Sequence, residues 1–372
     1  MKKFFPAYIS HIIQLLNKYQ EFAASKNPEH IVVIPIIKER IKKLQRRFFQ
    51  IQSRDDLTAP DQFKRNIRSF QTLLMEVEEL ECFGLPILTH YQKDFDGYLT
   101  YVLNQLCDEI GCPVEKPHVC AISTGTSGQG RDYYWYHRYF DTIFVPAAEK
   151  FSILNLPDLL HELGHHILKT YRQSFFEPFS GWFSNYNEML EKTLLLRDIR
   201  DSDRIVKSQK IFSEFWPSYW SEELVCDLIA VYCVGLAYAW TNLKICQSYH
   251  PDYESINIYY YAYHPPDSYR MDAILAMLKH LGIDCLDVEN TWFEYAEIYR
   301  HNKQALYDNY FPVDLIEKAV PHIFQICDEI GLVICHDNIK KNDTIIYKLN
   351  NAWSLIRRDP KDFQKLMEKP LI

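Results

Sequence analysis

Several features of common protein classes are absent from this sequence. The ten cysteines form no C-x-x-C pair, so neither a zinc ribbon nor a thioredoxin-type redox motif is supported. The cysteines are scattered through apolar runs, which favours reduced, buried thiols in a cytoplasmic protein over a disulfide framework. The net charge of −8 argues against general binding to nucleic acids or anionic membranes. No segment is low in complexity, and no long Gly/Ser linker divides the chain.

A convincing membrane-spanning segment is also missing. The best candidate, residues 224–240, is shorter than the roughly 20 residues that a bilayer requires, and it contains Asp227. We therefore expect a buried core helix there and no membrane span. The residues Met1-Lys2-Lys3 hint at a signal peptide, but Pro6 and His11 interrupt the apolar run that follows, which favours an amphipathic helix.

The chain does contain enough apolar material for a substantial core. It has 372 residues, 47% of them hydrophobic and 15% aromatic, which allows one large domain or two to three modest ones. Apolar residues recur at helical spacing in the first and last parts of the chain. We therefore expect a mostly helical α+β protein with three segments: a helical segment 1–116, a mixed core 117–282 and a helical segment 283–372. The letters CDEIG occur at 107–111 and 327–331 and indicate two similar helix ends rather than an internal repeat.

The β region is expected just before the middle of the chain. Residues 118–123 and 133–140 are strand-like, and residues 141–145 form a β-branched run that ends at Pro146. The glycine-rich residues 124–130 are typical of a flexible loop, which is either an ordinary surface loop or a flap over a nearby site.

The strongest chemical signal is the HExxH motif of residues 161–165. Residues 155–158 (NLPD) predict the start of its helix, with Asn155 as the capping residue, a proline in the first turn and an acid near the N-terminus. His161 and His165 are four residues apart, so both imidazoles project from one face and can reach a single Zn²⁺. Glu162 can take a proton from water bound to that metal. The alternative is a helix with two surface histidines, but the motif lies in an apolar helix, where unpaired polar groups are costly.

A third ligand is expected in a second apolar helix, residues 220–230. Glu223 and Asp227 are four apart and share one face, where like charges repel unless something positive lies nearby. A Zn²⁺ held by neutral histidines supplies that charge, so Glu223 is the predicted third ligand. Asp227 is then expected to accept a hydrogen bond from a ligand histidine. Glu222 is the rival ligand, but it would leave Asp227 on another face.

With this ligand set, residues 140–280 resemble the gluzincins, zinc peptidases that combine HExxH with a glutamate on a separate helix. The pattern is most similar to the CAAX-prenyl-protease-like and heat-shock membrane-peptidase branch, which often has a later His-Pro followed by an Arg, as in His264-Pro265 and Arg270 here. The resemblance implies a zincin-like core and a peptide or protein substrate, which would pair with an edge strand at 141–145. Those relatives usually carry several membrane spans, so their substrates and location are not carried over.

The residues His264 and Arg270 have two interpretations of about equal weight. They can lie beside the metal and stabilise the oxyanion of a tetrahedral intermediate, as tyrosines of residues 259–263 also can. Otherwise this stretch is a proline-bounded loop that caps a helix near Asp267, with Arg270 in a salt bridge to an acid such as Asp267 or Asp272.

The sequence therefore predicts a zinc-dependent metallopeptidase with Glu162 as general base. One alternative is a non-catalytic protein in which zinc only holds two helices together and the helical flanks bind a partner protein. Another is a metal-dependent hydrolase of a non-peptide amide or ester.

Overall fold

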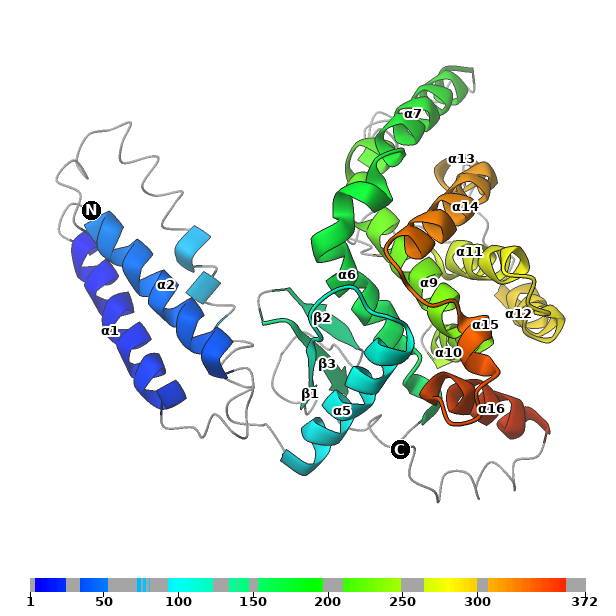
Figure 1. The fold of residues 1–372 in the computed structure, drawn as a ribbon. Helices are drawn as coiled ribbons and strands as arrows, with labels where there is room; N and C mark the ends of the chain where they lie inside the picture. Colours follow the sequence, from blue (N-terminus) through cyan, green and yellow to red (C-terminus); the bar gives the residue numbers. More distant parts are fainter. Residues whose placement is uncertain are drawn as a thin grey trace. The chain divides into compact units, whose positions relative to one another are not determined.

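The chain is mostly helical, with one small sheet (Figure 1). This arrangement confirms the expected mostly helical α+β class. A computed structural model describes residues 4–24, 34–52, 72–74, 76–77, 80, 93–122, 134–138, 140–146, 153–196, 210–248, 264–299 and 307–358. The chain forms two compact units: unit 1 comprises Met1–Tyr101 and His118–Lys150, and unit 2 comprises Val102–Pro117 and Phe151–Ile372. These units group the chain differently from the three segments expected from the sequence.

Unit 1 is built on two helices, α1 (Phe4–Ala24) and α2 (Ile34–Gln52), which pack against one another. Apolar residues at helical spacing on α2, such as Ile37, Ile41 and Leu44, are fully buried. They join a hydrophobic core that also includes Phe140 and Phe144. The basic stretch of residues 38–47 lies on this same helix, between its buried positions.

The sheet of unit 1 has three strands, β1 (His118–Ile122), β2 (Trp135–His137) and β3 (Thr142–Pro146), in the order β1-β3-β2. β3 pairs in parallel with β1 and antiparallel with β2. The expected role of residues 141–145 as an edge strand for substrate is therefore wrong, because hydrogen bonds on both sides occupy the backbone groups that an added strand needs. The loop of residues 124–130 lies outside the described residues.

Unit 2 is a helical assembly around α9 (Ser221–Val234). Three helices pack against it: α6 (Asp158–Phe176), α11 (Asp267–His280) and α14 (Val313–Glu329) (Figure 1). Every residue of α9 except Glu223 is buried, as its apolar sequence predicts. The helix α5 (Lys93–Glu109) runs from unit 1 into unit 2. The helical elements of unit 2 are η3 (Ile153–Asn155), α6 (Asp158–Phe176), α7 (Phe179–Leu196), the π-helix η4 (Ile211–Trp220), α9 (Ser221–Val234), α10 (Leu236–Ser248), α11 (Asp267–His280), α12 (Leu286–Tyr299), α13 (Tyr307–Tyr310), α14 (Val313–Glu329), α15 (Cys335–Ile339) and α16 (Ile345–Arg358).

The apolar run of residues 224–240 is not one helix. It is divided between α9 and α10 at Gly235, whose φ of 71° is a conformation that favours glycine and ends α9. Among the helices that the structure describes, none combines the length and the apolar character needed to cross a membrane.

The two CDEIG segments are two helix ends, as expected, and they lie against each other. At the end of α5, Gly111 has a φ of 62°, and the amide of Cys112 donates to the carbonyl of Cys107 at 2.8 Å. The end of α14 repeats this geometry around Gly331. Val333, just beyond, donates its amide to the carbonyl of Ile110 at 2.8 Å.

The end of α5 is also fastened to the start of α16. The carboxylate of Glu109 accepts the amide hydrogens of Ile345 at 2.7 Å and Ile346 at 3.0 Å, so it caps that helix from 236 residues away in sequence. The short segment 102–117 is thereby an integral part of unit 2.

Candidate metal centre

The helix α6 carries the HExxH motif, but it begins differently from the prediction. It starts at Asp158, after the short η3 turn, and Asn155 does not cap it. The side chain of Asn155 instead accepts a hydrogen bond from Lys244 of α10, so a tertiary partner has replaced the local cap. Asp158 does place an acid in the first turn, as expected.

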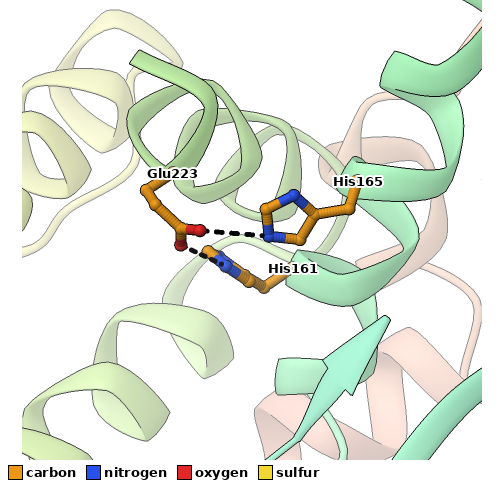
Figure 2. Close-up of side chains that lie close together, drawn as sticks. All are labelled: His161, His165 and Glu223. Atoms are coloured by element: carbon orange, nitrogen blue, oxygen red, sulfur yellow. Dashed lines mark hydrogen bonds and ion pairs between the residues drawn. The ribbon is translucent and has the colours of Figure 1, made fainter. Parts of the chain in front are cut away.

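Three side chains from two helices converge on one point (Figure 2). His161 and His165 project from α6 toward Glu223 of α9. The Nε2 atom of His161 lies 3.1 Å from one Glu223 oxygen, and Nε2 of His165 lies 3.4 Å from the other. One ligand atom from each residue lies within 4.8 Å of the others. The ligand set predicted from the sequence is therefore assembled.

These separations suit a divalent ion. Nitrogen and oxygen ligands bind Zn²⁺ at about 2.0–2.2 Å, so two ligand atoms of a tetrahedral ion lie about 3.3–3.5 Å apart. The two nitrogen–oxygen distances of 3.1 and 3.4 Å are close to that range. Two imidazole nitrogens and a carboxylate are also the ligand types that zinc prefers. The three side chains could therefore hold a divalent metal ion such as Zn²⁺.

The other ring nitrogen of His161 is bound to a fully buried carboxylate. Its Nδ1 donates to Asp227 at 2.9 Å, as the sequence predicts for a histidine oriented by a carboxylate. Asp227 also accepts the hydroxyl of Tyr238 at 2.5 Å and two bonds from Arg270, at 2.7 and 2.8 Å. These four bonds fix the carboxylate and, through it, the plane of the imidazole.

His165 has the same arrangement with different partners, which the sequence reasoning missed. Its Nδ1 lies 3.1 Å from Glu222, and Glu222 accepts a bond of 2.6 Å from Arg172. Glu222 is thus a partner of a ligand rather than a rival for the metal. One signal was present in the sequence: Arg172 lies seven residues after His165, two helical turns along the same face.

The close approach of the two helices depends on Gly164. A Cβ atom at this position would lie 3.0 Å from the Cα atom of Cys226 on α9. Because that neighbour is backbone, it cannot move aside by changing a rotamer. The glycine inside the HExxH motif therefore lets α9 lie close enough to present Glu223 to both histidines.

The remaining predicted site residues are also close. The Nδ1 atom of His264 lies 2.9 Å from Glu223, and the His264 side chain is 52% exposed. Arg270 forms a salt bridge to an acid, as one of the two interpretations expected, and that acid is Asp227, which the sequence did not indicate as its partner. Glu162 is buried, next to His161 in α6. The tyrosines of residues 259–263 lie outside the described residues.

Opposite charges within the cluster shift the pKa values of its histidines and of Glu223. Burial lowers the pKa of His161, but hydrogen bonds and charges from Asp227 and Glu223 outweigh it and raise the pKa well above its usual value. Burial is likewise overcome at His165, chiefly by the charge of Glu223, and its pKa is raised. At Glu223 burial raises the pKa, but the charges of His264 and His165 lower it well below its usual value. The charges of the carboxylates thus favour the protonated forms of His161 and His165, and a bound cation would compete with those protons.

Comparison of the chain with protein-family models, with curated proteins and with solved structures found no match.

Proposed function

We propose that this protein is a zinc-dependent hydrolase of peptide bonds. The observation that carries the proposal is the convergence of His161, His165 and Glu223, with Glu162 beside them on the same helix. The gluzincin arrangement inferred from the sequence has the same donor set, and it is the reason for choosing a peptide bond as the substrate. His161, His165 and Glu223 would hold the ion.

Glu162 is the general base and the general acid of this proposal. A bound zinc ion acidifies water and polarises a carbonyl group. Glu162 accepts the proton of the attacking water and delivers it to the leaving amine. Its side chain is 4% exposed, and little competing water surrounds a carboxylate in such a position.

Other residues orient the ligands. Asp227 and Glu222 accept the Nδ1 hydrogens of the two histidines, which leaves each Nε2 atom as the one that would bind the ion. Arg270 holds Asp227 through two hydrogen bonds, and we assign it a positioning role in place of the oxyanion contact expected from the sequence. His264 stays the candidate for that contact. Its Nδ1 atom donates to Glu223 at 2.9 Å, and in the doubly protonated form the half-exposed ring also has an Nε2–H group that can donate to the oxyanion.

The test separates metal binding from turnover. We expect Glu162→Gln to retain zinc after dialysis, measured by elemental mass spectrometry, and to lose at least a hundredfold in cleavage of a peptide library. Glu223→Ala should lose both zinc and activity. Glu177→Gln, which changes an exposed acid at the end of the same helix, is the matched control and should change neither.

Two outcomes would contradict the proposal. Full turnover by Glu162→Gln would remove the general-base assignment. Tightly bound zinc in a wild-type protein that cleaves no library peptide would favour a structural zinc that holds α6 and α9 together.

A further inference from the structure

Unit 2 contains a cavity of about 470 Å³ beside the last turns of α6. It lies among α6, α7, the π-helix η4 and the first residue of α9. Its apolar wall is formed by Pro217 and four phenylalanines, Phe176, Phe179, Phe183 and Phe212. A volume of this size is within the range of small-molecule sites, and aromatic walls favour an aromatic ligand.

Two polar atoms at this cavity need a partner. Ser221 is fully buried and lines the cavity, yet its hydroxyl has no hydrogen-bond partner among the described residues. Asn187 also lines it, and its side-chain oxygen is buried and unpaired within the described part of the chain, although its NH₂ group donates to Glu191. Buried polar groups are rarely left unsatisfied in native proteins. Both atoms therefore mark a wall of the cavity where polar groups lack a partner.

The charge of the residues that line the cavity indicates the charge of that ligand. Among the described residues that line the cavity, Arg172 is the only charged side chain. Its Nη1 atom donates to Glu222, and its guanidinium lies over the ring of Phe176, 4.9 Å from the centroid. A guanidinium has five N–H donors, so the bond to Glu222 leaves donors for a second carboxylate.

We propose that this cavity binds an aromatic group that carries a carboxylate. The ring would pack among the four phenylalanines, and the carboxylate would accept hydrogen bonds from Arg172. Arg172 already touches Glu222, which holds the metal ligand His165, so the bound carboxylate would lie two side chains away from that ligand. We further identify this ligand as the C-terminal aromatic residue of a peptide substrate, and this identification rests on the proposed function.

The experiment uses 3-phenylpropanoate and its neutral amide as probes of the full chain, titrated by calorimetry with zinc and again after chelation. We expect the carboxylate to bind in both states, about fivefold more tightly than the amide, since a charge-assisted bond to a half-exposed arginine is modestly stronger than a neutral one. Ser184→Trp, which fills the cavity from an exposed position on α7, should weaken binding at least tenfold. Asn185→Trp is the matched control, since it adds the same ring at the neighbouring exposed position outside the lining.

Binding that disappears on chelation and survives Ser184→Trp would place the probe on the metal and overturn the proposal. Equal affinity for the amide would overturn the assigned role of Arg172. Ser180→Trp is a second filling variant from the same lining, should Ser184→Trp fail to fold. Because the probe is not hydrolysed, loss of its binding refutes the cavity proposal, whereas absence of peptide cleavage refutes only the proposed function.

Discussion

Replacing Asp227 by asparagine should destabilise unit 2 severely, although the side chain keeps its size. Asp227 is fully buried, and Arg270, which is 11% exposed, donates two hydrogen bonds to it. Asparagine removes the negative charge and leaves the guanidinium buried without a counter-ion. Breaking a buried pair in this way costs about 3–5 kcal/mol, which is a large part of the roughly 5–15 kcal/mol by which a typical domain is stable.

Urea unfolding of the metal-free protein, followed by tryptophan fluorescence, measures this change. Of the seven tryptophans only Trp135 lies outside unit 2, so the signal reports mainly on the unit that is perturbed. Zinc affinity, measured with a competing chelator, should also fall about 10–100-fold, because Asp227 orients His161.

Two further variants test the physical cause. Asp227→Asn combined with Arg270→Met removes both charges and should recover much of the lost stability. Glu222→Gln breaks the corresponding pair at His165, but Arg172 is 43% exposed, so the loss there should stay below about 1 kcal/mol. Similar losses for Asp227→Asn and Glu222→Gln, or a loss below about 1 kcal/mol for Asp227→Asn, would refute the argument from burial.

Three other predictions concern packing, protons and thiols. Gly164→Ala should cost about 1–3 kcal/mol in unfolding and weaken zinc binding, because the added methyl meets the backbone of α9; unchanged zinc affinity would contradict it. Since the pKa values of His161 and His165 are raised, zinc should displace protons at neutral pH and should bind more weakly as the pH falls. Calorimetry in two buffers of different ionisation enthalpy measures the protons released, and heats of binding that are independent of the buffer would contradict this prediction. A hydrogen bond from Cys107 lowers the pKa of Cys112 to about 7, so iodoacetamide should modify Cys112 before the buried thiols at pH 7.5. Peptide mass spectrometry identifies the modified cysteine, and modification of a buried thiol first would contradict this prediction.

The parts of the site that follow from helical periodicity were predictable. Spacing of four residues placed His161 with His165 and Glu223 with Asp227, and the cost of buried charge indicated that the two pairs meet. The role of Arg270 was not predictable, because its partner lies 43 residues away and helical periodicity says nothing about contacts between helices. The prediction that Asn155 caps α6 was wrong for the same reason, since its side chain accepts a hydrogen bond from Lys244 of another helix.

The fold was predictable at the level of element type but not of pairing. The β-branched residues 141–145 formed a strand as expected, yet only the pairing of distant segments decides that this strand is central rather than at an edge. The grouping of residues 102–117 with unit 2 was equally unpredictable from the sequence, because it depends on contacts between Glu109 and the start of α16.

That last contact sets an order of events during synthesis. The carboxylate of Glu109 can accept these hydrogen bonds only after residues 345 and 346 have been translated, 236 and 237 positions later. At about 5–20 residues per second, a ribosome needs roughly 10 to 50 s to reach them. Until then the carboxylate of Glu109 lacks the two amide hydrogens that it accepts in the finished protein, and the helix start that it caps has not been made. The completed unit 2 is therefore a late product of translation, even though the HExxH helix emerges less than halfway along the chain.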